Sequence, residues 1–593
     1  MRPSLLLTAA LVTLAGCGAE QADRPLDDGD PLATNVGEEA EAPAPAAAGP
    51  VASARVLPAD AAAMVPDLPP ITEDMIAGRI ETLASDEFEG RAPASPGGTK
   101  TREYLVAQME EIGLEPVGGS YEQPVPLVEL TLDPAQSDVT FALPDGTERA
   151  LSYGDEAVWW TKQVQPEVSF EDGEVVFVGF GIDAPEYGWN DYEGLDVAGK
   201  TVVMLVNDPG FYEEGEDFGG KSMTYYGRWT YKFEEAARQG AAAAIIVHET
   251  EPAAYGWGVV EGSWSGPQLD LERPDGGASR AKAEAWITRD AAEELFEAAG
   301  LSFEEAKAQA LEGPTAIPLE GVTASARLTS TIERSESANV AGVIPGATVP
   351  DETVLYMAHW DHLGATMNPD GEDHVANGAV DNATGTAGLL AIAESFMGAQ
   401  ARPERSVMFL AVTAEESGLL GSAYYAEDPL VPLEETVAGI NMDAIQPTGP
   451  ARDLIVVGYG ASELEDVLGA IAEARGKTLT PDPAPQNGYF YRSDHISLAK
   501  KGVPMLYADK GEDLIEGGRE AGAAAAAAYT EDRYHKVTDE YDPPAFRLDG
   551  IAETLEILRD AGAALAYTDA SPNWYEGNEF RAVRDEQLGA AGD

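Results

Sequence analysis

The sequence predicts an α/β fold, an α/β/α sandwich around a mixed, mostly parallel central sheet, with a β-rich domain inserted into it. Two observations predict this. Between residues 165 and 320 the chain changes to short strand-like runs and glycine turns. In the C-terminal half, three apolar strand-like runs end close to polar residues: 354–358 before His359, 407–412 before Glu415 and 437–442 before Asp443. Because strands of open α/β sheets end at one crevice, these polar residues are expected to meet there.

A chain of 593 residues is too long for one compact core, so we expect two or three domains. We assign residues 71–160 and 335–570 to the main α/β domain and residues 165–320 to the insert. Residues 1–17 are expected to form a signal peptide, 18–70 a flexible acidic, Ala/Pro-rich tether and 571–593 a C-terminal tail.

The N-terminus has the features of an export signal. An apolar run, residues 5–15, follows Met1 and Arg2 and is too short to span a bilayer. It ends in Leu14-Ala15-Gly16-Cys17, which resembles the lipobox of bacterial lipoproteins; an incidental cysteine in an ordinary signal peptide is the alternative. The resemblance implies a lipid anchor at Cys17, the one cysteine of the chain, and a location on the outer membrane facing the periplasm, or on the cell surface.

The charge balance excludes some partners. The chain has 37 basic and 104 acidic residues and a formal net charge of −67. Such a chain would be repelled by nucleic acid and by an anionic bilayer, so neither is an expected partner through charge. The acidity fits either a high-salt environment or a solubilising surface.

Residues 215–222 formally match a phosphate-binding loop, but nucleotide binding is not expected. The loop should follow a strand and begin a helix, with its amides facing an anion. Here Glu213, Glu214, Glu216 and Asp217 would repel a triphosphate.

The main domain begins with helical spacing in residues 74–84, a break at 88–91 and 96–98, and a second helix, 99–112, that ends at Gly113. Within the insert we expect strands at 174–179, 201–206 and 242–247 and a helix at 232–239. The alanine run 523–528 fits either a helix or a disordered insertion.

Five short segments carry the chemistry. They are His359-Trp360-Asp361, Asp381-Asn382, Glu415-Glu416, Asn441-Met442-Asp443 and Tyr534-His535. Zinc binds imidazole nitrogen and carboxylate oxygen, and two zinc ions about 3.5–4 Å apart need a shared ligand. Asp381 suits that role, because a carboxylate has two oxygens and this one lies in a glycine-containing loop before a helix at 384–395. Glu415 and Glu416 are adjacent, so their side chains point in different directions. One can therefore bind a metal while the other accepts a proton.

This ordered set resembles the dizinc exopeptidase family, which includes vacuolar and bacterial leucine-type aminopeptidases and glutamate carboxypeptidase. The resemblance covers residues 71–150 and 335–570. It implies a fold of the zinc exopeptidase type and two zinc ions per chain. His359 and Asp443 would hold one ion, Glu416 and His535 the other, with Asp381 bridging them. Glu415 would be the general base and then the acid that protonates the leaving amine.

Further roles follow from the same resemblance. Asp361 would orient His359, and Tyr534 would either stabilise the oxyanion or pack against the sheet. Asp539 would be an outer partner of His535 or a solvated acid. Arg492, Asp494 and His495 would lie near the substrate pocket and not on a metal. We expect His248 and His374 to be structural or solvated, and assign His362 no ligand role.

The insert resembles the protease-associated domain. The resemblance depends on Gly199-Lys200 before one strand and on the pattern Ala-x-x-x-Gly-Ala at 236–241 before the next. It implies a module that covers the active-site cleft, with a simple spacer as the alternative. Tyr225 and Arg228 are candidate substrate contacts, although aromatic residues here fit a core equally well.

The expected function is hydrolysis of N-terminal residues from peptides. A carboxypeptidase or dipeptidase of the same fold stays open, with Arg228 or Arg492 binding the substrate carboxylate. A one-zinc glutaminyl cyclase and a receptor-like binding protein are less favoured, because all five ligand positions are present. No serine elbow supports a serine hydrolase. The sequence leaves open the residue preference, the native metal and the oligomeric state.

Overall fold

The main domain is built on a mixed sheet with the strand order β13–β17–β14–β18–β21–β19–β20. The pairs β14–β17, β14–β18, β18–β21 and β19–β20 are parallel, whereas β13–β17 and β19–β21 are antiparallel. The strands are β13 (Ile317–Ile344), β14 (Val349–His359), β17 (Arg405–Val412), β18 (Thr436–Asn441), β19 (Asp453–Val457), β20 (Thr478–Pro481) and β21 (Met505–Lys510). This arrangement confirms the predicted mixed α/β fold.

The computed structural model describes residues 57–212, 217–367 and 373–590. The predicted signal peptide with Cys17, and the first part of the tether, lie outside these residues, as do 213–216 at the start of the phosphate-loop-like segment. Among the described helices, none combines the length and apolarity that crossing a membrane requires.

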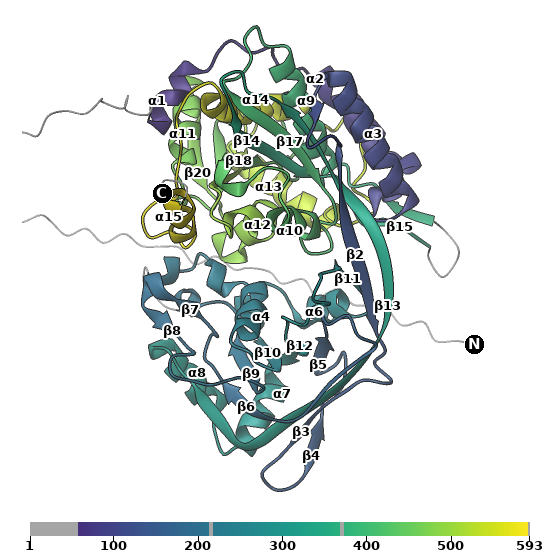
Figure 1. The fold of residues 1–593 in the computed structure, drawn as a ribbon, viewed down its shortest axis with the longest axis vertical. Coiled ribbons are helices and arrows are strands. Elements are labelled where there is room, and N and C mark those ends of the chain that lie inside the picture. Colours follow the sequence, from purple (N-terminus) through teal and green to yellow (C-terminus); the bar gives the residue numbers. More distant parts are fainter. Residues whose placement is uncertain (1–56, 213–216, 368–372, 591–593) are drawn as a thin grey trace, which may run out of the picture. The chain divides into compact units, whose positions relative to one another are not determined.

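Both faces of the main sheet are buried, as a three-layer sandwich requires. Val354, Tyr356 and Ala358 of β14 enter one core, and the alternating Leu355 and Met357 enter the other. Helices α2 (Glu73–Leu83), α9 (Ala383–Met397), α11 (Leu464–Ala474) and α14 (Leu548–Ala566) cover the first face, and α10 (Leu420–Glu427) and α12 (His495–Ala499) the second (Figure 1). The apolar runs of the sequence are therefore strands buried on two sides.

The first two helices of the main domain match their predictions closely. Helix α2 begins after Thr72, and α3 (Pro96–Ile112) ends at Gly113, which has a left-handed φ of 92°. One detail differs, because Pro96 begins α3 instead of separating the helices. Gly97 and Gly98 lie inside α3, where an added Cβ would come within 2.2 Å of the Phe88 carbonyl oxygen and 2.3 Å of that of Ala92.

The prediction that residues 18–70 form a flexible tether is wrong at the C-terminal end of this range. Residues 58–61 form helix α1 (Pro58–Ala61), which packs against α11. Ala61 is fully buried and Leu68 nearly so, both in the core that contains Ile71. Ala61 and Leu68 thus attach the end of the predicted tether to the core, although the composition of the tether has no apolar period.

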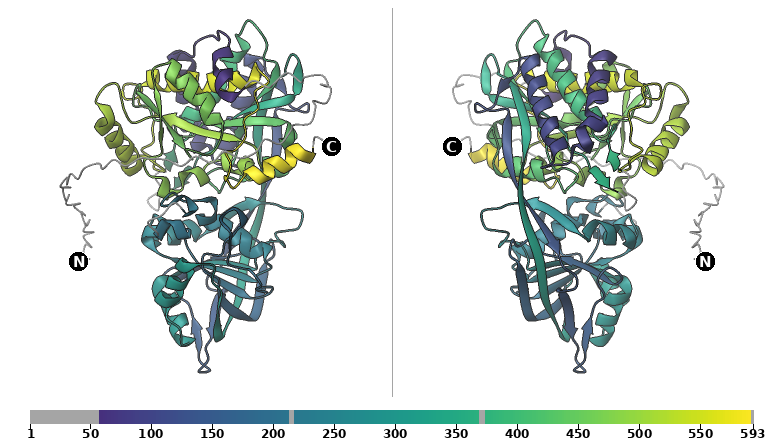
Figure 2. Two further views of the ribbon diagram at one scale, coloured as in Figure 1. Left: turned by 90° about the vertical axis from the view of Figure 1, so that its left-hand side faces the viewer. Right: turned by 90° about the vertical axis from the view of Figure 1, so that its right-hand side faces the viewer.

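The insert has its own sheet, ordered β4–β3–β13–β6–β9–β10–β12–β5. Its strands are β3 (Asp138–Ala142), β4 (Glu148–Ala150), β5 (Ala157–Trp160), β6 (Glu167–Phe177), β9 (Thr201–Leu205), β10 (Ala243–His248) and β12 (Ala283–Thr288). The predicted boundary at residue 160 is therefore too late, since 138–160 belong to this sheet. Strand β13 pairs in both sheets and passes from one to the other beside β2 (Glu122–Leu132), as Figure 2 shows.

The insert combines this sheet with helices in a layered α/β structure. Strands β6, β9, β10 and β12 are parallel neighbours. Val203 and Leu205 face one core, and Val202 and Met204 the other. Helix α4 (Trp229–Arg238) packs into the second core, and α7 (Arg289–Ala298) and α8 (Phe303–Glu312) into the first. The resemblance to a protease-associated domain stays a prediction.

Shorter elements complete the described chain. They are β1 (Glu115–Pro116), β7 (Asp183–Ala184), β8 (Trp189–Asn190), β11 (Pro267–Leu271), β15 (Gly364–Met367), β16 (Asp373–Ala376), α5 (Thr250–Ala253) and α6 (Trp257–Trp264). The alanine run is part of helix α13 (Gly518–Asp532). The C-terminal tail packs on the main domain through Trp574 and Phe580 and continues as α15 (Arg581–Ala590).

We expect Trp574→Ala to destabilise the main domain. Its indole is fully buried and donates to the Gly502 carbonyl oxygen at 2.9 Å. Truncating a buried Trp typically costs about 3–5 kcal/mol, so thermal unfolding of the variant should begin at a clearly lower temperature. Val583→Ala, at a position of α15 that is 38% exposed, is the matched control. Equal melting of both variants would contradict the packing of the tail.

Candidate metal centre

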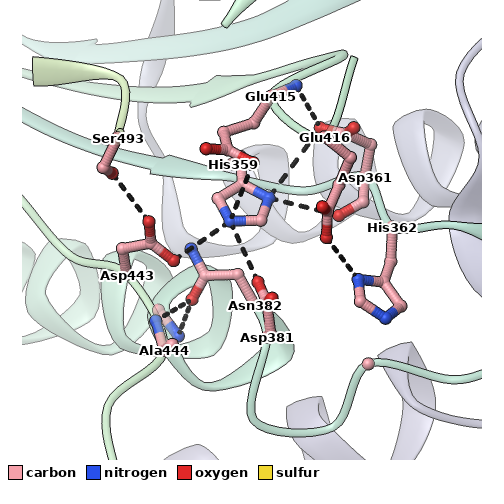
Figure 3. A network of polar contacts seen from close by, with 12 residues as sticks. His359, Asp361, His362, Asp381, Asn382, Glu415, Glu416, Asp443, Ala444 and Ser493 are labelled. Atoms are coloured by element: carbon pink, nitrogen blue, oxygen red, sulfur yellow. Dashed lines mark hydrogen bonds and ion pairs between the residues drawn. The ribbon is translucent and has the colours of Figure 1, made fainter. Parts of the chain in front are cut away.

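Five of the predicted site residues, His359, Asp381, Glu415, Glu416 and Asp443, lie together at the carboxyl ends of three neighbouring strands (Figure 3). His359 is the last residue of β14, Glu415 follows β17, and Asp443 follows β18. Asp381 precedes α9, and His535 follows α13. Since β14 pairs in parallel with both β17 and β18, these strands end on the same side of the sheet. The expected crevice is therefore present.

Asp381 faces two separate sets of ligand atoms. Its Oδ1 lies 3.3 Å from His359 Nε2, which is also 3.1 Å from Asp443 Oδ1. Its Oδ2 lies 3.4 Å from His535 Nε2, which is 3.0 Å from Glu416 Oε2. Asp381 thus has one oxygen toward each histidine–carboxylate pair. This donor set fits two divalent cations with a shared carboxylate.

Neighbouring polar groups hold the Asp381 loop in place. Asn382 caps α9 by accepting from Gly385 N at 2.9 Å, and it donates to the Met442 carbonyl oxygen at 3.0 Å. Asp539 Oδ2 accepts from the backbone N–H groups of Val380 at 3.0 Å and Asp381 at 3.1 Å. The loop before α9 is thereby tied both to the end of β18 and to the segment that carries His535.

Asp539 therefore has a different role from either prediction. It is fully buried, so it is not a solvated acid, and it holds the backbone of Asp381 and not the ring of His535. Its Oδ1 also pairs with Arg533 Nη2 at 3.1 Å.

The charges of the centre are strongly coupled. Burial opposes the charge on His359, yet the carboxylates of Asp443 and Glu415 outweigh it and raise the His359 pKa well above its usual range. Burial likewise opposes the ionisation of Asp381, but hydrogen bonds from His359 and His535 hold its pKa well below the usual range. The His535 pKa is raised to about 10, against burial, by Asp381 and Glu416. The carboxylates thus favour positive charge between them, whether from imidazolium groups or from bound cations.

Asp361 acts through a different atom from the one predicted. The His359 ring Nδ1 lies 3.2 Å from the backbone carbonyl oxygen of Asp361, whereas the carboxylate Oδ1 is 3.9 Å away. That carboxylate oxygen instead accepts from the Glu415 N–H at 3.1 Å. Asp361 thus positions both His359, through its main chain, and Glu415, through its side chain.

Glu415 stands apart from the two ligand sets. Its nearest approach to a histidine is 4.0 Å, to His359 Nε2. Burial, together with the nearby Glu416 and Asp443, raises its pKa well above the usual range, although His359 opposes this. A half-buried carboxyl of raised pKa, with a side chain 12% exposed, has the properties of a proton acceptor and donor.

Tyr534 lies at the open side of the centre. Its ring stacks on that of His535 at 3.9 Å between centroids, and the residue is 44% exposed. The alternative that it packs against the sheet is therefore wrong.

The segment 492–495 supports the centre, but not all of it faces substrate. Ser493, which the sequence did not single out, donates to Asp443 Oδ2 at 2.7 Å and accepts from Asn441 Nδ2 at 2.7 Å. Asp494 is fully buried, and burial raises its pKa to about 7, with His359 opposing. His495 is fully buried between the rings of Phe490 and Tyr507, so its prediction as a pocket residue is wrong.

Tyr225 packs between the insert and the main domain. Its hydroxyl donates to Glu234 Oε2 at 3.0 Å, and Glu234 pairs with Lys500 Nζ at 2.8 Å. Its ring lies 5.8 Å from that of Phe580. The residue therefore joins the insert to the main domain, because packing uses both its polar and its apolar parts.

Two residues of the centre were missed by sequence analysis. His362 Nδ1 lies 2.6 Å from Glu416 Oε1, and His362, Asp381 and Glu416 form one of the two groups whose ligand atoms all lie within 4.8 Å. Arg91, fully buried, donates to the carbonyl oxygens of Trp360, Leu83, Asn377 and Gly378. The pattern His-x-Asp-His was a signal for His362, whereas Arg91 lies too far away in the sequence to be recognised.

Two groups of His, Asp and Glu side chains in this fold could each hold a metal ion: His359, Asp381 and Asp443, and His362, Asp381 and Glu416. Residues 339–558 match the model of Peptidase family M28. The mouse protein "Aminopeptidase NAALADL1" is 40% identical over 118 residues, 19% of this chain and 14% of that protein. A "Glutamate carboxypeptidase 2 homolog" of Caenorhabditis briggsae is 34% identical over 113 residues, 18% of this chain and 13% of that protein.

Among solved structures, an aminopeptidase from Aneurinibacillus sp. strain AM-1 is similar with a TM-score of 0.43 and 19% identity. The similarity covers 84% of this chain and 94% of that one. The matched region therefore spans only a small part of the curated relatives, but most of the bacterial enzyme.

We expect His362→Ala to weaken metal binding at the Glu416 side only. Loss of a partner that orients a ligand typically costs about 10–100-fold in metal affinity. Titration with Zn²⁺ should then show one weakened site and one unchanged site. Asp381→Asn, by contrast, should weaken both sites, because its carboxylate is shared. The control is His374→Asn on β16; equal zinc affinities in His362→Ala and this control would contradict the role of His362.

Proposed function

We propose that the chain is a zinc-dependent exopeptidase and, more specifically, an aminopeptidase with two cocatalytic zinc ions. The observation that carries this proposal is Asp381, which directs one oxygen toward each of two histidine–carboxylate pairs. Support comes from Glu415, a further, half-buried carboxylate that belongs to neither pair, and from the match of residues 339–558 to Peptidase family M28.

His359 and Asp443 would hold one ion, Glu416 and His535 the other, and Asp381 would bind both. His362 lies close enough to Glu416 to support the second position. Bound there, zinc ions supply a Lewis acid for the peptide carbonyl and lower the pKa of water from about 15.7 toward 7. The donor set of imidazole nitrogen and carboxylate oxygen suits zinc, although other divalent ions accept the same ligands.

Glu415 would move the proton. Its main chain is fixed by Asp361, so the carboxylate is held beside the cation positions without taking a ligand role. It would accept a proton from the attacking water and pass it to the leaving amine, a role for which a raised pKa is suitable. The Tyr534 hydroxyl, at the open side, would donate to the developing oxyanion.

A carboxypeptidase or dipeptidase is the second candidate. It is favoured by Arg228 and Arg492, whose buried guanidinium nitrogens have no hydrogen-bond partner among the described residues. A binding protein without activity is less favoured, because every ligand position carries a residue that can bind metal.

For the cellular context we propose an exported bacterial lipoprotein that reaches the membrane only through a lipid on Cys17. Peptides are its proposed partners, and nucleic acid is not, given the net charge of −67.

The full-length protein can be tested with peptides that have either free or acetylated N-termini. Release of single N-terminal residues from the free peptides alone, read by mass spectrometry and abolished by a chelator, is the expected result. Trimming of both sets from the C-terminus would replace the aminopeptidase by a carboxypeptidase.

We expect Glu415→Gln to retain both metals and to lose about 10²–10⁴-fold in kcat, because the proton acceptor is removed. Metal content by elemental analysis and kcat on one peptide give the two readouts. Glu473→Gln, at an exposed position of α11, is the matched control. Full activity of Glu415→Gln with normal metal content would refute the mechanism.

A further inference from the structure

We propose that His362 is a reserve ligand of the second metal position. When His535 is displaced, His362 binds the ion through Nδ1, together with Glu416 and Asp381. The inference rests on the proposed two-zinc function, and it adds a further metal-binding side chain to those that the sequence predicts.

The carboxylate of Glu416 faces two different histidines (Figure 3). Its Oε2 lies 3.0 Å from His535 Nε2, and its Oε1 lies 2.6 Å from His362 Nδ1. The two imidazole rings are 6.1 Å apart between their centroids. Glu416 thus offers one oxygen to an ion beside His535 and the other oxygen to an ion beside His362. A small movement of the ion around this carboxylate exchanges one histidine for the other.

His362 completes a set of possible ligands without His535. One ligand atom from each of His362, Asp381 and Glu416 lies within 4.8 Å of the other two. Three protein ligands of imidazole nitrogen and carboxylate oxygen are sufficient for a catalytic zinc ion, with water in the fourth position. The second metal position therefore keeps a complete protein donor set when His535 is withdrawn.

The second ring nitrogen of His362 has no partner. The side chain is fully buried, and its Nε2 makes no hydrogen bond among the described residues. A histidine that binds a metal permanently normally donates its other N–H to an oxygen. His359 does so, because its Nδ1 lies 3.2 Å from the Asp361 carbonyl oxygen. His362 lacks such a contact, which explains why it is not the resident ligand.

The free Nε2 also leaves the tautomer of His362 open, since no acceptor holds a proton on that nitrogen. With its proton on Nδ1, the ring donates to Glu416 and orients this carboxylate. With its proton on Nε2, the ring presents the lone pair of Nδ1, and a zinc ion accepts that lone pair. One side chain can therefore serve in either role.

The two histidines differ in how firmly the chain holds them. His362 is 1% exposed, and its N–H donates to the Arg91 carbonyl oxygen at 3.4 Å. Its ring lies so close to Gly378 that an added Cβ there would come within 2.6 Å of it. His535, by contrast, lies in the exposed segment 534–538 and has a left-handed φ of 56°, which is unfavourable for residues other than glycine. His535 is therefore more easily withdrawn from the centre than His362.

A reserve ligand can be separated experimentally from a residue that only orients Glu416. Orientation needs one N–H donor, and an Asn side chain supplies such a donor. Zinc binding needs a nitrogen lone pair, which the amide of Asn does not offer. The substitution His362→Asn thus keeps the first role and removes the second.

The test measures the zinc stoichiometry and affinity of the full-length protein, by elemental analysis and by competition with a chromophoric chelator. We expect wild type and His362→Asn to bind two zinc ions with similar affinities. His535→Ala should also bind two ions, the second less tightly. In the double variant His535→Ala/His362→Asn the second site should weaken further by at least about 100-fold, the upper end of the cost of losing an orienting partner.

The matched control is His535→Ala/His374→Asn, which should bind zinc as His535→Ala does. His374 lies on β16 and belongs to neither metal-binding group of the described residues. Melting curves of the metal-free proteins establish that the variants fold, and His362→Gln takes the place of His362→Asn if the latter does not.

Two results would overturn the reserve ligand and leave the two-zinc proposal intact. The first is loss of the second ion in His535→Ala alone, and the second is equal zinc binding by His535→Ala and the double variant. If wild type binds a single zinc ion, the proposed two-zinc function itself fails. Peptide cleavage does not enter the measurement, so the exopeptidase activity can fail while the reserve ligand is confirmed.

Discussion

The repulsion between buried carboxylates is the constraint that shapes the main domain. Asp381, Glu416 and Asp443 bring their oxygens within hydrogen-bonding distance of two histidines, and Glu415 lies beside them. Such groups remain ionised together only if positive charge lies between them. The loops that carry them must therefore be held from outside, by contacts that do not depend on the ligands.

These outside contacts are made by side chains, and mostly to backbone groups. Asp539 binds the N–H groups of Val380 and Asp381, and Asn382 joins the start of α9 to the end of β18. Arg91 connects the turn after β14, the turn before Asp381 and the end of α2, because it donates to the carbonyl oxygens of Trp360, Asn377, Gly378 and Leu83. Each contact fixes main chain instead of competing for ligand atoms. These contacts hold the backbone of the centre without using ligand atoms, and such preorganisation favours metal affinity.

The insert is joined to this centre by a continuous element. Strand β13 pairs with β6 in the insert and with β17 in the main sheet, so the two sheets share one strand. Lys500 pairs with Glu234 at 2.8 Å, and the Met223 N–H donates to the Pro485 carbonyl oxygen at 3.3 Å, both between the insert and the main domain. These contacts position Arg228 near residues of the main domain.

The sequence by itself determined the strands and most of the ligands. Val354–Ala358 and Val407–Val412 are apolar throughout, as expected of strands that are buried on both faces. The two strands are parallel, so the polar residues that follow them lie at the same edge of the sheet. His359, Asp381, Glu415, Glu416, Asp443 and His535 followed from that rule together with the family resemblance. The helices α2 and α3 followed from local spacing and from Gly113.

Only the tertiary structure decided which contacts are made across long sequence separations. The packing of α1, the shared strand β13 and the buried Arg91 depend on segments that no local pattern connects. The same holds for Asp539, whose partners Val380 and Asp381 are remote in sequence, and for the pairing of His362 with Glu416. Local sequence encodes the period and the polarity of an element. The packing of the elements decides which polar atoms lie together in the interior, because each buried donor must then find an acceptor.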